Sequence, residues 1–346
     1  MTATTPFAWP PVLSRLITGD DLTGPEARAA MDEIMSGRAT PAQTAAFIVS
    51  LRTKGETAEE ITGLVQGMRD AMIGVDTGGV VVDTAGTGGD RSGTFNISTT
   101  AALIAAGAGA RVAKHGNRAA SSESGSADVL EALGFAIDLP PEATAQMIEE
   151  TRFGFFFAPR YHPAMRHAGP VRRELGVPTV FNFLGPLCNP AGATRQALGV
   201  ADPRMAERMI EVLRNLGSEY AFVFYGEDGL DELTVTGPSY IYRLRGGEIT
   251  HAEFTPEDFG VPRSPAEALR GGDAARNAGI TRDVLSGQPG PARDVSLINA
   301  AAAIVAAGLA EGFVEGVEAA AAAVDGGAAR DVLERAAALS RDLASG

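Results

Sequence analysis

Four short segments of the chain carry residue types that could bind a polyanion and a metal ion. The first is the glycine-rich loop Gly86-Thr87-Gly88-Gly89-Asp90, which directly follows the β-branched run 80–82. Glycines at the end of a strand let backbone N–H groups approach phosphate oxygens without interference from a Cβ atom. The loop is not a dinucleotide fingerprint, because Arg91 occupies its last glycine position, and no Gly-Lys-Ser/Thr of a Walker A loop follows. Taken alone it could be a plain glycine turn.

The second segment, Thr94-Phe95-Asn96-Ile97-Ser98-Thr99-Thr100, precedes an apolar, helix-like stretch at 101–106. Four hydroxyls and an amide therefore gather where a helix is expected to begin. Ordinary capping needs only one of these side chains. A helix N-terminus offers free N–H groups and the positive end of the helix dipole, so the pattern favours a phosphate site.

The third segment, Lys114-His115-Gly116-Asn117-Arg118, follows a second expected strand at 110–113. Lys114 and Arg118 are local cations in an otherwise acidic chain. Small residues suited to wrapping a diphosphate continue the segment, namely Ala119, Ala120, Ser121, Ser122, Ser124 and Ser126. Parallel strands present their carboxyl ends at one edge of a sheet, so we expect this segment to face the same crevice as the glycine loop. The alternative is a solvated basic rim.

The fourth segment is the acidic pair Asp231-Glu232, which follows a third expected strand at 220–225. Adjacent carboxylates often only face solvent. Here they are the best candidates for Mg²⁺ ligands, because Mg²⁺ prefers a few carboxylates together with substrate phosphates. A zinc site built from His115, His162 and His167 fits no familiar spacing, and Cys188 lacks a feature that would activate it as a nucleophile, so we expect neither.

Composition excludes several classes of function. The formal net charge of the 346 residues is -14, which argues against a general nucleic-acid or anionic-membrane binder. The single cysteine, Cys188, rules out an intramolecular disulfide and a cysteine zinc cage. The first residues resemble no secretory signal, and no stretch is long and apolar enough for a membrane span. We expect a cytoplasmic protein without a membrane partner.

The elements that must position these segments fall into two parts. Three capping boxes, Thr23…Glu26, Thr40…Gln43 and Thr57…Glu60, predict a small helical unit over the first 70 or so residues. Beyond Gly78, strands alternate with helices, one of them at 127–133, and the Ala-rich tail after 299 reads as helix. This order predicts an α/β fold: a small all-helical domain plus a larger domain with a mainly parallel central sheet covered by helices.

Together, these segments resemble the anthranilate phosphoribosyltransferase family. The resemblance rests on the order and spacing of motifs across nearly the whole chain. They are the glycine loop, Asn96–Thr99, Lys114–Gly134, His162–Met165, Val171–Gly176, Phe181–Leu187 and Asp231–Leu233. It implies a small α domain of residues 1–73 completed by about 160–183. A large α/β domain of 74–159 and 184–346 would follow, with the active site at the hinge. It also implies a homodimer formed through the small domain.

The resemblance further implies roles for individual residues. 5-Phosphoribosyl 1-diphosphate (PRPP) would be bound by Gly86, Gly89, Asp90, Thr94, Asn96, Ile97, Ser98, Thr99, Lys114, His115, Gly116, Asn117, Arg118, Ala119, Ala120, Ser121, Ser122 and Ser126. Ser98, Asp231 and Glu232 would bind Mg²⁺, as two ions. Anthranilate would contact Gly86, Asn117, His162 and Arg172, with His115 and Pro186 along its path. Lys114, Asn117 and Arg172 would be the catalytic residues.

The implied reaction transfers the 5-phosphoribosyl group of PRPP to the amine of anthranilate, giving N-(5-phosphoribosyl)anthranilate and diphosphate, in tryptophan biosynthesis. The amine is already a neutral nucleophile, so donors and metal ligands suffice without a strong base. Two departures from the family pattern stand out. Glu123 replaces a residue that is basic in many relatives, and we expect its side chain to point away from the diphosphate. Cys188 replaces a frequent threonine.

Two other functions remain as alternatives. A pyrimidine-nucleoside phosphorylase shares this fold and a glycine-rich phosphate loop, but it needs no diphosphate-bound Mg²⁺. The Asp231-Glu232 pair and the segment 182–190 speak against it. A non-catalytic relative that binds nucleic acid would require a basic surface, which the net charge of -14 opposes.

Overall fold

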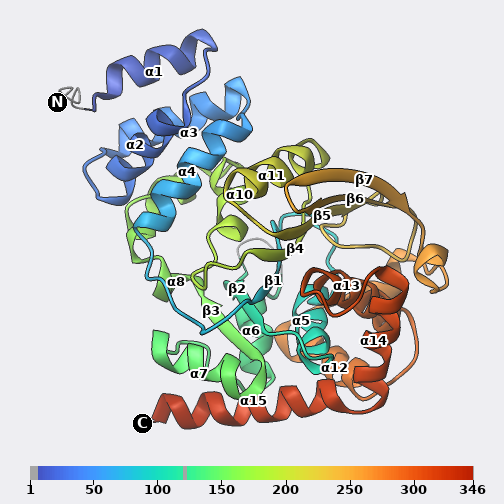
Figure 1. Ribbon diagram of the computed structural model, residues 1–346. Coiled ribbons are helices and arrows are strands. Elements are labelled where there is room, and N and C mark those ends of the chain that lie inside the picture. Colours follow the sequence, from blue (N-terminus) through green and yellow to red (C-terminus); the bar gives the residue numbers. More distant parts are fainter. Residues whose placement is uncertain (1–6, 120–122, 346) are drawn as a thin grey trace. The chain divides into compact units, whose positions relative to one another are not determined.

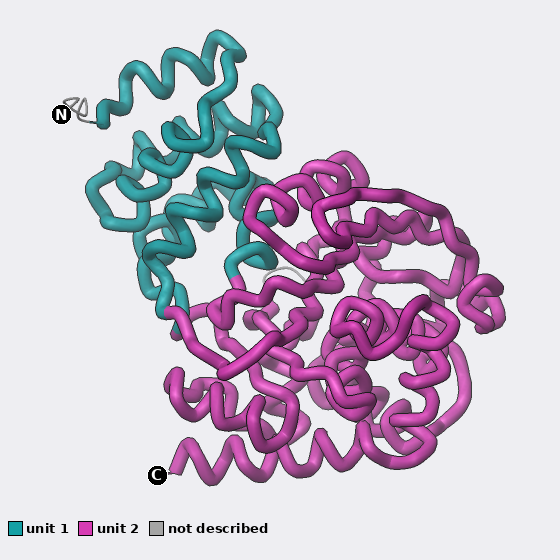
Figure 2. Tube along the Cα trace, viewed as in Figure 1, with its two compact units in different colours: residues 1–73, 161–188 teal, residues 74–160, 189–346 magenta. Residues whose placement is uncertain are grey.

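The computed structural model describes residues 7–119 and 123–345 and divides the chain into two compact units (Figure 2). The helical unit contains residues 1–73 and 161–188, and the α/β unit contains 74–160 and 189–346. Residues 184–188 therefore belong to the helical unit, whereas the sequence placed them in the larger domain. A physical reason is that the Arg69 guanidinium donates two hydrogen bonds, of 2.9 and 2.6 Å, to the carbonyl of Leu187.

The helical unit begins with four helices whose starts are fixed by their own sequence. They are α1 (Trp9–Thr18), α2 (Gly24–Met35), α3 (Pro41–Lys54) and α4 (Ala58–Asp70). All three predicted capping boxes are confirmed: Thr23, Thr40 and Thr57 each accept a backbone N–H three residues ahead. The second segment adds the end of α8 (Ala158–Tyr161), α9 (Gly169–Leu175), α10 (Phe181–Leu184) and two 3₁₀ turns, η1 (Pro163–Arg166) and η2 (Gly185–Leu187).

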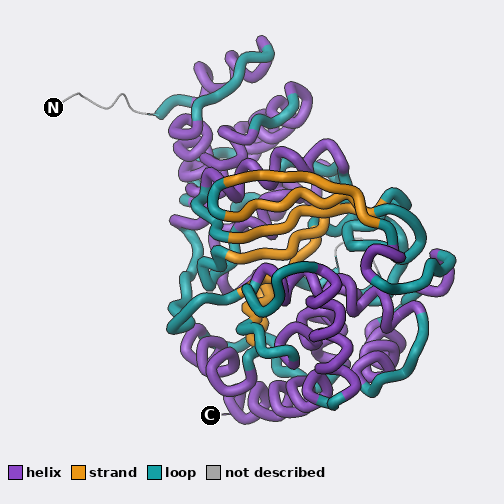
Figure 3. Tube along the Cα trace, turned by 45° about the vertical axis from the view of Figure 1, so that its right-hand side comes forward, coloured by secondary structure: helices purple, strands orange, loops and turns teal. Residues whose placement is uncertain are grey.

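The α/β unit is built on one seven-stranded sheet (Figure 3). Its strands are β1 (Val82–Gly86), β2 (Val112–Gly116), β3 (Phe153–Phe157), β4 (Arg195–Gly199), β5 (Tyr220–Gly226), β6 (Ser239–Arg245) and β7 (Glu248–Phe254). The spatial order is β3-β2-β1-β4-β5-β6-β7; β1 to β5 are parallel, and β6 and β7 are antiparallel. The predicted fold class, with a mainly parallel sheet, is confirmed.

Two predicted strands were placed too early in the sequence. Val80 is exposed and precedes β1, which continues through Asp83 to Gly86. Similarly, β2 runs through Lys114 and His115 to Gly116 instead of ending at Ala113. In both cases polar residues lie inside a strand because neighbouring strands pair with their backbones: β4 with β1, and β3 with β2. The start of the third segment is thus part of the sheet.

Helices cover the sheet as expected (Figure 1). Near its centre, α5 (Ile97–Gly107) and α13 (Pro291–Ala306) pack against each other and against β1. The small side chains of their Ala-rich sequences allow this close packing. The other helices are α6 (Ser126–Ala132), α7 (Pro141–Thr151), α11 (Pro203–Asn215), α12 (Ala274–Leu285), α14 (Phe313–Asp325) and α15 (Ala328–Ser345), with 3₁₀ turns η3 (Pro256–Phe259) and η4 (Ala266–Leu269). The predicted helical tail after Asn299 is confirmed.

The strand order locates the place where a ligand is expected. From the adjacent strands β1 and β4, the sheet grows towards β2 and β3 on one side and towards β5 on the other. In such sheets, ligands bind outside the carboxyl ends of the strands at this switch point. Gly86, the last residue of β1, pairs with Gly199, the last residue of β4. Within the described ranges, no helix has the length and apolar character needed to cross a bilayer.

Candidate active site

Asp231 packs directly against the carboxyl ends of β1 and β4. A Cβ atom added to Gly86 would overlap the Asp231 carboxylate, and one added to Gly199 would overlap the Asp231 carbonyl. Only glycine at these two positions permits this approach. The Asp231 carboxylate also accepts a hydrogen bond of 2.7 Å from the Gly88 N–H. The glycine loop and the acidic pair, 143 residues apart in sequence, therefore meet at the switch point.

Glu232 joins the second and third segments to this cluster. Its Oε1 atom accepts a hydrogen bond of 3.1 Å from the N–H of Ser98, in the first turn of α5. The Ser98 hydroxyl lies 3.3 Å from the Nζ atom of Lys114, which also donates to the Thr84 carbonyl at 2.6 Å. All four segments singled out in the sequence thus contribute to one edge of the sheet, since Lys114 begins the third.

Burial makes the charges of this cluster costly. Lys114 is 2% exposed, and Asp231 and Glu232 are each 9% exposed. Desolvation, followed by the nearby negative charge of Asp90, raises the pKa of Asp231 to about 7. Desolvation and repulsion from Asp231 raise the pKa of Glu232. Desolvation also lowers the pKa of Lys114, against the attraction of Asp83, Glu232 and Asp231. A bound cation would favour the ionised carboxylates.

The donor set fits magnesium better than zinc. Two carboxylates and the Ser98 hydroxyl offer only oxygen, which Mg²⁺ prefers, and Mg²⁺ usually completes its shell with water and substrate phosphates. Among residues 7–119 and 123–345, no group of three or more His, Cys, Asp or Glu side chains could hold a metal ion. The acidic pair and Ser98 would supply part of a magnesium shell, which substrate phosphates and water would complete.

The segment between β2 and α6 folds back on itself. The Asn117 carbonyl accepts hydrogen bonds from the Ser126 hydroxyl and the Ala127 N–H, both 3.2 Å long. The Asp128 carboxylate accepts from the Ala119 N–H at 2.9 Å and from the Gly125 N–H at 2.8 Å. These four bonds hold the two ends of the segment together. The predicted residues Ala120, Ser121 and Ser122 lie outside the described residues.

Arg118, one of the two local cations noted in the sequence, is paired within the protein. Its guanidinium forms ion pairs with Asp128 at 3.0 Å and with Glu131 at 2.5 Å, and lies 5.7 Å from the centre of the Phe157 ring. Both carboxylates come from α6, ten and thirteen residues further along the chain. The positive charge of Arg118 is thus compensated within the protein, and Lys114 is the cation that faces the acidic pair. Glu123 is exposed.

Other predicted residues on this edge are held by the protein itself. The Asn96 amide donates to the Ser124 carbonyl at 3.1 Å and accepts from Asn277 at 2.9 Å. Ile97 and Thr99 are buried, and the Ile97 N–H already donates to the Phe95 carbonyl at 2.8 Å. The Ser92 hydroxyl donates to Asp90 at 2.6 Å and lies 3.3 Å from the Thr94 hydroxyl. The remaining candidates, Gly89, His115 and Gly116, lie on the glycine loop and at the end of β2.

Candidate residues for the second substrate lie in the helical unit. Arg172, on α9, stacks over the Phe181 ring at 5.2 Å, and burial lowers its pKa. Burial also lowers the pKa of His162 to about 4, so its imidazole is neutral near pH 7. Pro186 lies in η2. Cys188 is buried, which raises its pKa to about 12, and a thiol this weakly acidic is a poor nucleophile at neutral pH.

The structure also reveals residues that sequence reasoning missed. Asp83 lies inside β1, fully buried, and accepts a 3.1 Å hydrogen bond from the His115 N–H. Its burial raises its pKa to about 6. A carboxylate at the end of a Val-Val-Val run was a usable signal, because charged residues rarely enter central strands. Asn277, which binds Asn96 from 181 residues away, had no local signal.

Comparisons with known proteins agree with this geometry. Residues 78–330 match the model of the glycosyl transferase family α/β domain, and residues 10–72 match its helical bundle domain. The anthranilate phosphoribosyltransferase of Symbiobacterium thermophilum is 53% identical over 325 residues, covering 94% of this chain and 95% of the relative.

Two solved structures have the same fold. The anthranilate phosphoribosyltransferase of Thermus thermophilus superposes with a TM-score of 0.91 at 44% identity, covering 95% of this chain and 99% of that one. The enzyme of Saccharomyces cerevisiae in complex with PRPP and Mg has a TM-score of 0.87 at 26% identity, covering 96% and 98%. With near-complete coverage by such relatives, the chain belongs to the anthranilate phosphoribosyltransferase family.

Proposed function

We propose that this chain transfers the 5-phosphoribosyl group of PRPP to the amine of anthranilate, in tryptophan biosynthesis. The observation that carries the proposal is the cluster of Lys114, Ser98, Asp231 and Glu232 at the switch point of the sheet. Buried groups with shifted pKa values in such a place are typical of functional sites. The family of the chain and the names of its relatives support the same reaction.

The acidic pair binds magnesium in this proposal, as two ions held by Asp231, Glu232 and the Ser98 hydroxyl. When bound, Mg²⁺ neutralises the charge that develops on the diphosphate as it leaves. Lys114 adds a fixed positive charge beside the same group. The yeast relative, which was solved with PRPP and Mg, supports the choice of metal and ligand.

The PRPP phosphates are bound mainly by backbone donors. The first turn of α5, with Ser98 and Thr99, directs the positive end of the helix dipole at the switch point, where the Ser98 N–H donates to Glu232. Gly88 and Gly89 both have a positive φ, of 67° and 84°, which turns the loop sharply after β1. Asn117, Ala119 and Ser126 contribute from the folded-back segment before α6.

Arg172 binds the anthranilate carboxylate. Its planar guanidinium can donate two parallel hydrogen bonds to a carboxylate, and its stacking on Phe181 holds it in place. Neutral His162 offers an uncharged neighbour for the aromatic ring. No residue is needed to deprotonate the amine before attack, because an aromatic amine attacks in its neutral form. The acidic proton of the resulting ammonium is lost to water or to the departing diphosphate once the C–N bond has formed.

The oligomeric state and location complete the proposal. Ile17 and Val49 are 74% and 40% exposed on the helical unit. The family resemblance supports a homodimer formed through this unit, which we propose, and these two exposed side chains are candidate contacts. We place the protein in the cytoplasm, and take the two compact units as its domains.

The first experiment follows anthranilate fluorescence in a mixture of purified protein, anthranilate, PRPP and Mg²⁺. A loss of fluorescence that requires all three additions supports the proposed reaction. No loss with folded protein would contradict it. Thymidine with inorganic phosphate, and then nucleic acid, would be tested next for the two alternative functions.

A second experiment tests Arg172. We expect Arg172→Ala to raise the KM for anthranilate by roughly ten- to a hundredfold, because it removes charge-assisted hydrogen bonds to the carboxylate. Arg173→Ala is the matched control, since Arg173 is exposed and adjacent on α9. A large loss of kcat with an unchanged KM would contradict the proposed role.

A further inference from the structure

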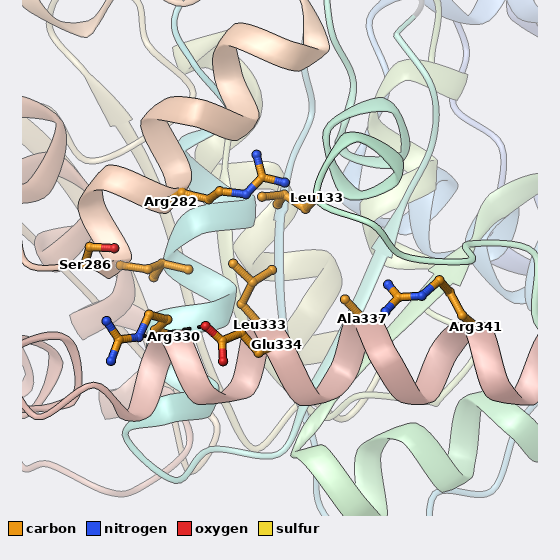
Figure 4. A pocket seen from close by; sticks show the side chains of 9 residues that line it. Leu133, Arg282, Ser286, Arg330, Leu333, Glu334, Ala337 and Arg341 are labelled. Atoms are coloured by element: carbon orange, nitrogen blue, oxygen red, sulfur yellow. Dashed lines mark ion pairs between the residues drawn. The ribbon is translucent and has the colours of Figure 1, made fainter.

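A hollow of about 440 Å³ lies in the α/β unit among α12, α15 and the end of α6 (Figure 4). It is separate from the cluster at the strand ends. Ser126 begins α6 beside that cluster, whereas Leu133 follows the last residue of this helix and lines the hollow. Seven helical residues span roughly 10 Å. Likewise Asn277, in the first half of α12, contacts Asn96, whereas Leu285 at its end lines the hollow.

The floor of the hollow is apolar. Leu133, Leu285, Leu333 and Ala337 line it, and each is at most 6% exposed. Figure 4 shows Leu333 pointing from α15 into this space, opposite Leu133. The volume lies in the range typical of small-molecule pockets, which are mostly apolar with a few placed polar groups. The hollow can therefore accommodate the apolar body of a small organic molecule.

The rim is positively charged, in contrast to the chain as a whole. Three arginines line it, Arg282, Arg330 and Arg341, with Glu334 as the one acidic residue of the lining. Their formal charges sum to +2, in a chain whose net charge is -14. A local excess of positive charge against that background favours an anion.

Two of these arginines are positioned by the end of α6. Arg282 donates to the Ala132 carbonyl at 2.9 Å, and Arg341 donates to the Gly134 carbonyl at 2.6 Å. Each arginine thus uses one N–H donor on a backbone carbonyl at the C-terminal end of α6. A guanidinium carries five N–H donors in a planar fork, so both retain donors for a ligand. Arg330 pairs only loosely with Glu334, at 4.0 Å.

We propose that this hollow binds a small organic carboxylate with an apolar body. The body lies on the leucine floor, and the carboxylate accepts hydrogen bonds from the arginines of the rim. An arginine fork matches a carboxylate in geometry and charge. The apolar floor distinguishes such a ligand from a simple inorganic anion. This binding site is independent of the transfer reaction at the strand ends.

The test is calorimetric titration of full-length protein with 1-naphthoate. Arg172→Ala protein serves as the background, so that the site proposed for anthranilate is weakened. We expect saturable binding that Arg330→Ala weakens by roughly tenfold, because a charge-assisted hydrogen bond is lost. Ser286 is exposed at the edge of the hollow, so the larger side chain of Ser286→Phe should block binding sterically. Arg335→Ala is the matched control, since Arg335 is an exposed arginine of α15 outside the lining.

Several outcomes would overturn the proposal. One is the absence of 1-naphthoate binding to the background protein. Another is binding that neither Arg330→Ala nor Ser286→Phe changes, with thermal unfolding showing that both variants are folded. Equal affinity for neutral 1-naphthalenemethanol would exclude a role for the arginines, and equal affinity for inorganic phosphate would exclude a role for the leucine floor.

Discussion

The helical unit and the strand-end edge of the α/β unit use polar side chains in opposite ways. In the helical unit, Thr23, Thr40 and Thr57 each bind a backbone N–H three residues ahead, so a local contact satisfies each group. At the strand ends, Asp231 and Glu232 bind N–H groups that lie 143 and 134 residues away. The local hydrogen bonds satisfy backbone groups at helix ends, whereas the long-range hydrogen bonds hold charged side chains together at the strand ends.

The pKa shifts sharpen this contrast between carboxylates of the two regions. In the capping box of α2, the backbone N–H of Thr23 lowers the pKa of Glu26, so folding favours its ionised form. At the strand ends, burial raises the pKa of Glu232, so folding opposes its ionised form. Without a ligand, a buried carboxylate such as that of Glu232 lowers the stability of the folded protein. A bound cation would offset this loss of stability, which explains why the carboxylate is present.

The largest expected effect tests this interpretation directly. Glu232→Gln preserves the shape of the side chain and an oxygen to accept the Ser98 N–H, but removes the negative charge. We expect kcat/KM to fall by roughly a hundred- to a thousandfold, as when a group that stabilises developing charge is removed. The thermal midpoint without Mg²⁺ should stay the same or rise, because a buried charge is lost.

Glu227→Gln is the control for Glu232→Gln, because Glu227 is an exposed acid in the same connection after β5. It should leave both activity and stability unchanged. If Glu232→Gln kept activity within about threefold of the native enzyme, or lowered the midpoint as the loss of a cap does, the contrast between the two regions would be wrong.

A pH-dependent effect is expected within the helical unit. Burial lowers the pKa of His162 from 6.5 to about 4. The unfolded chain thus binds a proton more readily than the folded one. The stability linked to His162 is complete above about pH 6.5 and is lost as the pH falls towards 4. By linkage, the loss is about 3 kcal/mol.

Urea unfolding at pH 7 and at pH 4.5 measures this linkage. His162→Gln should lose less stability than the native protein between these two values, because the titrating group is gone. His251→Gln replaces an exposed histidine of β7 and should lose as much as the native protein does. Equal losses in all three proteins would contradict the assignment to His162.

A smaller effect is expected in the segment before α6. Asp128→Asn weakens the acceptor that binds the Ala119 and Gly125 N–H groups, and with it the shape of a segment proposed to bind PRPP. We expect the KM for PRPP to rise roughly tenfold with little change in the KM for anthranilate. Glu131→Gln removes an ion pair of Arg118 without touching those N–H groups, so it should have a much weaker effect. Equal effects of both changes would mean that Arg118, and not the backbone, matters.

The features that were predicted from the sequence are those that depend on residues near one another in the chain. The capping boxes, the alternation of strands and helices and the four chemical segments all follow from residues close together in the chain. The meeting of these segments followed from one further rule, that parallel strands end at the same edge of a sheet. The ion pairs of Arg118 with Asp128 and Glu131 were not predicted, because they lie across a fold-back that residue types did not reveal.

Several strands were missed for a related reason. Phe153–Phe157 is a short apolar run, which periodicity cannot distinguish from a buried helix segment. Arg195–Gly199 has little β propensity of its own and is a strand because it lies between β1 and β5. The extension of β1 through Asp83 likewise depends on pairing with β4. Pairing with neighbouring strands, which the local sequence does not reveal, decided the structure in all three cases.

The smallest expected effect concerns the N-cap of α3 in the helical unit. Thr40 accepts the Gln43 N–H at 3.2 Å at the start of α3, so Thr40→Ala should lower stability by about 1 kcal/mol. For a chain of this size, the thermal midpoint should fall by about 1–2 °C. Thr40→Ser retains the hydroxyl and should restore most of the loss, while kcat and both KM values stay unchanged. This pattern is the reverse of that expected for Glu232→Gln. A tenfold loss of activity in Thr40→Ala at an unchanged midpoint would contradict this comparison. It would mean that a local cap contributes to activity, as the buried charges at the strand ends are expected to do.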